Sequence, residues 1–295
     1  MITVIPDIHA DLDRLKASLA VARGVRPAFL GDFIDAGSNP GTRLDDRAVL
    51  ERVRPLVDRG EALAVMGNHE LNAILYHRRG SDGEWLRKHS DKNESQHRSF
   101  LKAFGDDSPE ALSWTDWFLD ALPLWHEGDG FRLVHAVWSD ADIALIRARR
   151  PDARLRPEDL QEVAGKVTPF AKAVGRITSG HEATLPPGYS FRDKGGAERR
   201  EVRLSWWRAG RTWPEVTLSV PDVSGLPEGQ LPEGILPHPY PDTAAPVFVG
   251  HYKMTGAPKI EAPRVICLDY PETACVYHWR GEMALRAEHL EHIGI

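Results

Sequence analysis

The sequence predicts an α/β sandwich whose functional residues lie in loops at the carboxyl ends of strands. An apolar, β-branched run at 2–6 leads into a polar loop, and Leu12, Leu15 and Leu19 then recur at helical spacing. This strand–loop–helix unit recurs along the first 80 residues, and a polar cluster follows the strand each time. Because ligands of such folds bind at the carboxyl ends of strands, the polar clusters predict a site there.

The second and third units follow the same order. A short strand at about 28–31 runs into GDFID, and a helix from about 43 to 59 follows, which we expect to be kinked or broken at Pro55. A strand at 62–66 then runs into GNHE and a helix that ends near Tyr76. Two further helices are expected, the second opening with a Ser-Pro pair as its N-cap and first residue.

The remaining strands bracket a segment of different character. Residues 131–138 and 247–251 are typical of buried strands, and 264–270 with 275–280 predict a closing antiparallel pair. Between about 140 and 245 the chain has two helix candidates and a Pro/Gly-rich run. We interpret this segment as an insertion or cap within a single domain spanning residues 1–295.

Composition narrows the class of protein. The 295 residues, 42% of them hydrophobic, suffice for one large core, and no apolar run approaches the roughly 18 residues of a membrane span. The N-terminus lacks the features of a signal peptide, so we expect a cytoplasmic protein with no membrane partner. The net charge of −6 disfavours a stable nucleic-acid partner, and the two cysteines exclude a disulfide framework.

Five short motifs place oxygen or imidazole groups at the ends of strands. Singly, each has a structural explanation: an aspartate as a helix N-cap, Gly-Asn as a tight turn, or a histidine in the core. Together they supply the ligand types that a pair of divalent cations requires. The motifs are Asp7-Ile8-His9, Gly31-Asp32-Phe33-Ile34-Asp35, Gly67-Asn68-His69-Glu70, His135 and Gly250-His251.

In their order, these motifs resemble the signature of the calcineurin-like metallophosphoesterase superfamily: DxH, GDxxD, GNHE, a later strand histidine and GH. The resemblance covers residues 1–80, 131–138 and 247–270. It implies a four-layer α/β/β/α sandwich of two mixed sheets and a metal-dependent phosphoric ester hydrolase.

The resemblance also assigns roles to individual residues. Asp7 and His9 would hold one divalent ion, the Asp32 carboxylate would bridge two ions, and a second set of residues would complete the second site. That second set is Asn68, His135 and His251. A hydroxide bridging the ions would attack phosphorus in line with the leaving group. The expected ion is Mn²⁺, with Fe and Zn as alternatives.

A histidine–aspartate pair completes the expected chemistry. His69 adjoins the ligand Asn68 and would donate a proton to the leaving group, while Asp35 would orient it. The alternative is that the pair only supports the metal site. Glu70 is expected to be a helix-opening carboxylate that complements the helix dipole rather than a ligand.

The sequence departs from the family pattern where phosphate is usually gripped. Ala36 and Met66 stand where related branches carry arginines, and Ala10 replaces a glycine. Other basic residues must then bind the phosphate group. The alternative for each candidate is a solvated surface residue without a role in binding. These candidates are Lys253, Arg192, Arg203 and Arg208. Asp269 resembles an acidic position of bacterial end-healing phosphatases of the superfamily and is expected to support the site.

Other polar and aromatic residues have weaker signals. His77, His89 and His97 closely follow the GNHE helix, so one of them could line a substrate channel, although packing or surface roles are expected for the histidines outside the motifs. Trp206 and Trp207 could stack a nucleobase. Packing beneath the inserted segment is the favoured explanation for the tryptophans.

Several activities fit this set of residues. The leading hypothesis is hydrolysis of phosphomonoesters, or of small phosphodiesters, by a dinuclear metal site, with a small phosphorylated substrate such as a nucleotide. Dinucleoside polyphosphates or nucleic-acid ends are alternative substrates, and phosphoproteins are less favoured because both arginines are missing. A metal-free interaction scaffold is the alternative from another class, which the complete set of ligand types argues against.

Overall fold

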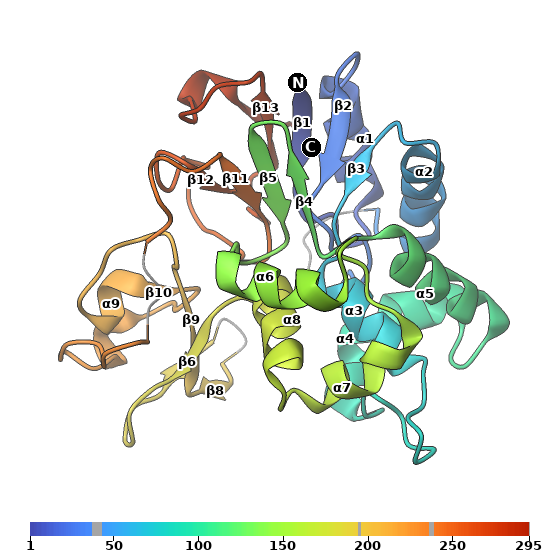
Figure 1. The fold of residues 1–295 in the computed structure, drawn as a ribbon, viewed down its shortest axis with the longest axis horizontal. Coiled ribbons are helices and arrows are strands. Elements are labelled where there is room, and N and C mark those ends of the chain that lie inside the picture. Colours follow the sequence, from blue (N-terminus) through green and yellow to red (C-terminus); the bar gives the residue numbers. More distant parts are fainter. Residues whose placement is uncertain (37–42, 194–195, 236–238, 295) are drawn as a thin grey trace.

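Two mixed β-sheets face each other at the centre of the protein, as a computed structural model that describes residues 1–36, 43–193, 196–235 and 239–294 shows (Figure 1). In the five-stranded sheet the order is β14-β13-β1-β2-β3, and in the four-stranded sheet it is β12-β11-β5-β4. The strands of the first sheet are β1 (Ile2–Ile5), β2 (Arg26–Phe29), β3 (Leu63–Ala64), β13 (Cys275–Trp279) and β14 (Leu290–His292). Those of the second are β4 (Trp125–Gly128), β5 (Phe131–Val134), β11 (Val247–Val249) and β12 (Val265–Cys267).

Parallel pairing in both sheets directs the strand ends to one side of the molecule. Strands β1, β2 and β3 are parallel to one another, as are β5, β11 and β12. Strand β13 pairs antiparallel with β1, and β4 with β5, which makes both sheets mixed as expected. The loops that follow the parallel strands therefore converge at the lower edge of the sheets in Figure 1.

The expected closing antiparallel pair was wrong. Strand β12 pairs in parallel with β11 in one sheet, whereas β13 pairs with β1 and β14 in the other. The connection between them crosses from sheet to sheet, and the Arg14 guanidinium fixes its path by donating hydrogen bonds to the Tyr270 and Pro271 carbonyls. Strands β12 and β13, which are neighbours in the sequence, therefore belong to different sheets.

Eight helices of six residues or more surround the sheets in the described part of the chain. They are α1 (Leu12–Val21), α2 (Asp46–Asp58), α3 (Asn68–Tyr76), α4 (Asp91–Phe104), α5 (Pro109–Ala121), α6 (Asp140–Arg149), α7 (Leu160–Gly165) and α8 (Pro169–Ser179). Three short 3-10 helices cover Pro157–Asp159, Val223–Gly225 and Ala287–His289. The Ser108 side chain caps α5, and Pro109 is its first residue, as the sequence predicts.

Helix α2 continues through Pro55 to Asp58, so of the two expected outcomes, a kink or a break, the break is wrong. A proline inside a helix removes one hydrogen bond and costs ~3 kcal/mol. The buried face of α2, which includes Val49, Leu50 and Val53, offsets that cost by packing in the core. At the other end of the helix, the Asp45 side chain accepts a hydrogen bond from Ala48 N.

Alternating side chains divide the core into layers. Val4 of β1 and Leu133 of β5 lie in a cluster between the two sheets, while Ile5 and Val134, one residue further along, lie in a larger cluster that includes the helices. This period of two is what a strand buried on both faces requires. The alternation confirms the four-layer α/β/β/α arrangement.

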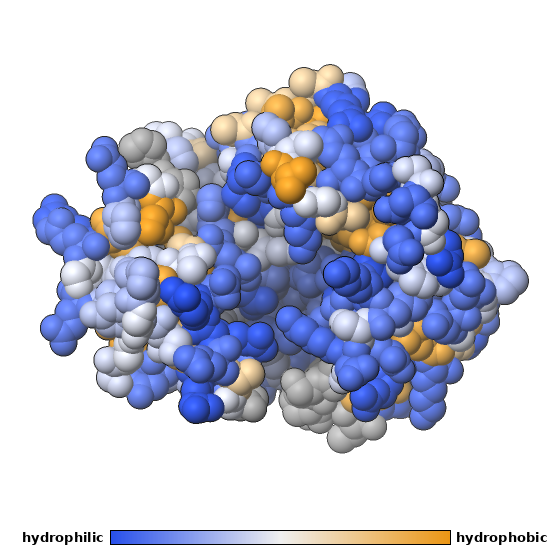
Figure 2. Space-filling model, turned by 90° about the horizontal axis from the view of Figure 1, so that it is seen from below, coloured by the Kyte–Doolittle hydropathy of each residue, from blue (hydrophilic) through white to orange (hydrophobic). Residues whose placement is uncertain are grey.

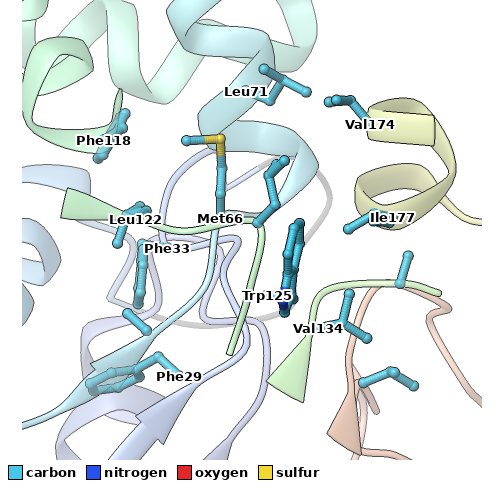
Figure 3. Close-up of a cluster of buried hydrophobic side chains, with 14 of the residues drawn as sticks. Phe29, Phe33, Met66, Leu71, Phe118, Leu122, Trp125, Val134, Val174 and Ile177 are labelled. Atoms are coloured by element: carbon cyan, nitrogen blue, oxygen red, sulfur yellow. The ribbon is translucent and has the colours of Figure 1, made fainter. Parts of the chain in front are cut away.

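The larger cluster ties the helices to both sheets (Figure 3). Figure 3 shows the Met66 side chain among buried apolar groups that include Leu71 of α3, Phe118 of α5 and Ile177 of α8. Met66 is fully buried, and its main-chain N–H donates to the Pro123 carbonyl. The sheets and helices beside the strand ends thus share one core.

The segment expected to be an insertion has two structurally different parts. Helices α6, α7 and α8 contribute to the larger cluster, so residues 140–179 pack with the main body. Beyond them, β6 (Glu182–Thr184), β9 (Glu201–Leu204) and β10 (Thr217–Leu218) form a three-stranded sheet, and β7 (Phe191–Arg192) pairs with β8 (Glu198–Arg199). Residues of β9 and α9 (Trp213–Val216) belong to a separate small cluster. None of the helices formed by the described residues combines the length and apolar character of a membrane span.

Candidate metal centre

The predicted ligands meet at the carboxyl ends of five strands from both sheets. They follow β1, β2, β3, β5 and β11, and they are Asp7, His9, Asp32, Asn68, His135 and His251. Most of these side chains are buried, while Asn68 is half-buried. All but His135 line a hollow of about 1250 Å³. Figure 2 shows this face of the molecule, hollowed in its middle and surrounded mostly by hydrophilic residues.

Asp32 is shared by two groups of side chains that could each hold a metal ion. One group is His9, Asp32 and His69, and the other is Asp7, Asp32 and His135, with ligand atoms within 4.8 Å of one another in each group. Oδ2 of Asp32 lies 3.8 Å from Nε2 of His9 and 3.4 Å from Nε2 of His135. A carboxylate in this position can contact two ions at once.

Main-chain carbonyls set the orientation of two of the imidazoles. His9 Nδ1 lies 3.3 Å from the Ile34 carbonyl, and His135 Nδ1 lies 2.7 Å from the Leu30 carbonyl. If each Nδ1–H donates to its carbonyl, each Nε2 keeps its lone pair and faces the carboxylates. Such hydrogen bonds are the usual way of orienting a metal-binding histidine.

Asn68 and two histidines form the other part of the centre. Asn68 Oδ1 lies 3.0 Å from His135 Nε2 and 2.8 Å from His251 Nδ1. The His251 main-chain N–H donates to the Asp7 carboxylate at 3.1 Å, which links the first and last motifs. His251 Nε2 is buried and has no hydrogen-bond partner among the described residues. The Asn68 amide oxygen lies between two imidazole nitrogens, His135 Nε2 and His251 Nδ1, and this donor set fits a cation.

Glu70 organises the loops that carry these groups. Its carboxylate, fully buried, accepts hydrogen bonds from the N–H groups of Asp32, Phe33 and Gly67 at 2.8–3.0 Å. As expected, it opens α3, but it also joins two motif loops. A Cβ on Gly67 would lie 2.2 Å from Asp32 Oδ1, so only glycine permits this approach.

Left-handed backbone is concentrated around the centre. Among the described non-glycine residues with positive φ, five belong to the motifs or adjoin them: His9, Ala10, Asp32, Asp35 and His251. Each such residue costs roughly 1–3 kcal/mol and persists only where the surroundings impose it. The buried hydrogen bonds of Glu70 and Asp7 supply that restraint. Strain gathered in this way marks a functional site.

Opposite charges are held close together in the centre. Burial opposes ionisation of Asp32, but His135 and His69 outweigh it and hold the pKa of Asp32 well below its usual range. Burial likewise lowers the pKa of His135, but the Asp32 carboxylate outweighs it and raises the value to about 10. Burial and His69 lower the pKa of His9 to about 4. A cation would replace the His135 proton, since an imidazole ligand must be neutral.

His69 and Asp35, the expected acid pair, are in direct contact. His69 Nδ1 lies 2.8 Å from Asp35 Oδ2, while His69 Nε2 faces Asp32 Oδ2 at 3.9 Å. Burial lowers the pKa of His69, but the Asp32 and Asp35 carboxylates outweigh it and raise the value to about 9. The two carboxylates therefore favour the protonated form of His69, and its Nε2 also lies within reach of an ion beside Asp32.

Two histidines on the far side of Asp35, His97 and His77, were not expected as partners of this pair. His97 Nδ1 lies 2.8 Å from Asp35 Oδ1, and His97 Nε2 lies 3.1 Å from His77 Nε2. Both histidines are buried, and neither lines the hollow. The sequence did indicate that His97 is buried, because it lies three residues before Phe100 and seven before Phe104, on the same face of α4.

The basic candidates divide between the hollow and the surface. Arg203 and Lys253 line the hollow. Arg208 and Arg192 are not among the lining residues. Arg208 forms an ion pair with Glu261 at 2.6 Å, and the exposed Arg192 side chain donates to the Gly196 carbonyl.

Asp269 and Arg87 also line the hollow. Asp269 is buried and accepts a hydrogen bond from the Lys253 main-chain N–H at 2.7 Å. Arg87 was not expected here from the sequence, and its guanidinium donates to the neutral Gln96 side chain. Burial lowers the pKa of Arg87, and the Asp35 carboxylate partly opposes this effect.

Comparison with known proteins identifies the family. Residues 1–203 match the calcineurin-like phosphoesterase family. The chain belongs to the calcineurin-like phosphoesterase family. It is thereby a member of a family of metal-dependent phosphoesterases, as its motifs indicated. A search of curated proteins found no match to the sequence.

Solved structures show more distant likeness to this calcineurin-like phosphoesterase. A metallophosphoesterase from Sphaerobacter thermophilus has 26% identity and a TM-score of 0.31 over 48% of this chain, which spans about half, 52%, of that chain. A structure provisionally described as a diadenosine tetraphosphatase has 14% identity and a TM-score of 0.43, covering 94% of this chain and 86% of that one. A cold-active protein-tyrosine phosphatase of a psychrophilic Shewanella species has 13% identity and a TM-score of 0.41, covering 99% and 80%.

Two positions that distinguish this calcineurin-like phosphoesterase from related branches have clear surroundings. Ala36 lines the hollow, and its N–H donates to the Ser99 hydroxyl at 2.9 Å. Met66 points into the apolar cluster instead (Figure 3). Trp206 and Trp207 are buried and pack against Tyr240 and Tyr252, which confirms packing as their role.

Proposed function

We propose that this phosphoesterase is a dinuclear metal-dependent phosphatase that hydrolyses small phosphate esters. The observation that carries the proposal is the position of Asp32 between two groups of candidate ligands. We assign Asp7 and His9, whose Oδ2 and Nε2 atoms lie 3.8 Å apart, to one ion, and Asn68, His135 and His251, which the Asn68 Oδ1 atom links, to the other. The mixture of carboxylate, amide and imidazole donors suits Mn²⁺, with Fe and Zn as alternatives.

Two divalent ions, when bound, supply a nucleophile at neutral pH by lowering the pKa of water. The residues around them supply position and protons. Carbonyl-oriented His9 and His135 keep their Nε2 atoms aimed at the centre. Glu70 holds the Asp32 loop, so the ligand atoms need little rearrangement when substrate arrives.

His69 would act as the general acid. Its Nδ1 is engaged by Asp35, so its Nε2 is the atom free to face the leaving-group oxygen. Proton donation spares the leaving alcohol from departing as an alkoxide and contributes roughly 10²–10⁴-fold to the rate. The benefit is largest for alcohols of high pKa.

Arg203, Lys253 and Arg87 would grip the phosphate in place of the absent arginines. Arg203 comes from β9, Lys253 from the loop after β11, and Arg87 from the segment before α4. Three cationic side chains from separate elements thus line the hollow, and guanidinium groups bind phosphate oxygens with two parallel hydrogen bonds.

The hollow admits more than a phosphate group. Its volume of about 1250 Å³ exceeds the roughly 300–1,000 Å³ of typical small-molecule sites, so the esterified alcohol can be sizeable. Nucleotides fit this space. The buried tryptophans leave no exposed aromatic platform at positions 206 and 207, so the observations do not favour nucleic-acid ends as substrate.

The test begins with chelator-stripped protein reloaded with Mn²⁺ and assayed with 4-nitrophenyl phosphate and bis(4-nitrophenyl) phosphate. Asp32→Asn and His135→Ala are expected to abolish metal-dependent turnover. Asp142→Asn is the matched control, because Asp142 is a buried carboxylate that binds Arg176 outside the hollow. Full activity of either of the first two variants would sink the proposal. A panel of nucleotides, dinucleoside polyphosphates, end-phosphorylated oligonucleotides and phosphopeptides would then define the substrate.

A further inference from the structure

Four buried or half-buried side chains form a continuous hydrogen-bonded row behind the acid. His69 contacts one oxygen of Asp35 at 2.8 Å, and His97 contacts the other oxygen at 2.8 Å. His97 in turn contacts His77 at 3.1 Å. The proposed acid is thus the outermost member of a row that extends away from the hollow through α4 to the end of α3.

The Asp35 carboxylate is the acceptor at the centre of the row. Burial opposes ionisation of Asp35, but His97 and His69 outweigh it and lower the pKa of Asp35 to about 2, so the carboxylate accepts from both Nδ1–H groups. Between His97 Nε2 and His77 Nε2, 3.1 Å apart, one ring nitrogen donates and the other accepts. The remaining nitrogen, His77 Nδ1, is buried and has no partner among the described residues, so the row ends there.

Packing holds His97 rigidly in this row. Its ring is fully buried and stacks on Phe100 with a centroid separation of 4.6 Å and an interplanar angle of 16°. The Tyr76 ring lies 5.1 Å away on another side. Asp35, held by an imidazole on each oxygen, therefore has little freedom to rotate about its terminal torsion.

We infer that His97, supported by His77, is a positioning residue that fixes the Asp35 carboxylate so that His69 delivers its proton to the leaving group. The inference rests on the proposed function, in which His69 is the acid. His97 touches neither the hollow nor the candidate ligands, so its removal acts on proton delivery through Asp35. We therefore expect removal of His97 to lower kcat for substrates whose leaving group needs a proton.

The matched variants separate positioning from packing. His97→Leu removes both hydrogen bonds and keeps an apolar side chain, whereas His97→Asn retains a donor at the place of Nδ1. His89→Gln is the control, since His89 stacks on Tyr76 and contacts its carbonyl but not Asp35. If His97→Leu does not fold, His97→Gln, whose amide lies at the place of Nε2, replaces it.

Mn²⁺-loaded protein is assayed with glycerol 2-phosphate, whose leaving group needs protonation, and with 4-nitrophenyl phosphate, whose leaving group needs it little. We expect His97→Leu to lower kcat for the glycerol ester roughly 10–100-fold, with KM within about twofold and a loss below about threefold for the nitrophenyl ester. His97→Asn should recover most of the loss. Equal losses on both esters, or none, would overturn the inference.

A spectroscopic measurement tests the row without turnover. In metal-free protein labelled with ¹⁵N-histidine, the His97 and His69 Nδ1–H signals should both lie at low field, and His97→Leu should shift the His69 signal. An unmoved His69 signal counts against positioning. If wild-type protein hydrolyses neither ester, the proposed function fails. If His69→Ala shows the leaving-group dependence and His97→Leu does not, only the positioning role fails.

Discussion

Glu70 and Asp32 are joined by a hydrogen bond of 2.8 Å from the Asp32 main-chain N–H to Glu70 Oε2. The same oxygen accepts from Gly67, and Oε1 accepts from Phe33. Burial and Asp32 raise the pKa of Glu70 to about 7, so the site retains a carboxylate that is costly to ionise. The position of the Asp32 carboxylate thus depends on a residue that is not among the proposed ligands.

Glu70→Gln is expected to weaken metal binding while leaving the protein folded. The NH₂ group of the glutamine would face main-chain N–H groups that now donate to a carboxylate oxygen. Leaving a buried N–H group without an acceptor costs about 1–3 kcal/mol. Loss of support for a ligand lowers metal affinity roughly 10–100-fold. Mn²⁺ titration by calorimetry measures the change. Affinity equal to that of wild type would show that the Asp32 loop holds its position without Glu70.

His69→Ala separates the acid role from a ligand role. Because His69 Nε2 also lies near Asp32, an ion could use it as a donor. We expect the variant to bind the same number of Mn²⁺ ions as wild type and to lose activity mainly on esters with poor leaving groups. Elemental analysis of the purified variant gives the number directly. Loss of an ion would reassign His69 as a ligand.

Arg87→Met and Arg203→Met should each raise KM roughly 10–100-fold with a smaller change in kcat. Hydrogen bonds to charged groups are worth about 1.5–3 kcal/mol, and a contact made equally in the ground and transition states affects KM. Arg192→Met is the control because Arg192 is exposed away from the hollow. An unchanged KM in either of the first two variants would remove that arginine from the phosphate grip.

Asp46→Asn should change how stability depends on pH. Burial and Asp35 raise the pKa of Asp46 to about 6 from 3.8. A raised carboxyl pKa means that the folded state holds the proton more tightly, so its stabilising contribution is complete below pH 3.8 and is lost as pH rises through 6. The loss is at most about 3 kcal/mol.

The asparagine variant keeps the acceptor for Asp35 N and lacks this titration. The difference in the free energy of unfolding, variant minus wild type, should therefore increase between pH 4 and 7 in metal-free protein. Urea unfolding at several pH values measures it. A difference independent of pH would contradict the assigned environment of Asp46.

The sequence was informative wherever structure is local. Each motif follows directly on a strand, and parallel strands of one sheet bring their carboxyl ends together, so Asp7 and Asp32 could be placed side by side from their order alone. The mostly apolar runs of β1 and β5 similarly predict burial on both faces. These features depend on a few neighbouring residues.

Long-range packing determined what the sequence could not show. His97 meets Asp35 across 62 positions because α4 packs beside the hollow, and no local pattern specifies that contact. Strand β12 likewise pairs with β11 rather than with β13, which is closer in sequence, because pairing partners are set by the whole sheet. Arg87 entered the hollow for the same reason, from a passage that reads as a polar loop.

The number of metal ions bound per chain tests the central claim most directly. Chelator-stripped protein titrated with Mn²⁺ should bind two ions, and Asp32→Asn should bind fewer and more weakly, because one carboxylate serves both groups. The variant retains the acceptor for His69 N, so it should keep its fold. Binding of one ion by wild type, or of two ions with unchanged affinity by Asp32→Asn, would contradict the dinuclear centre.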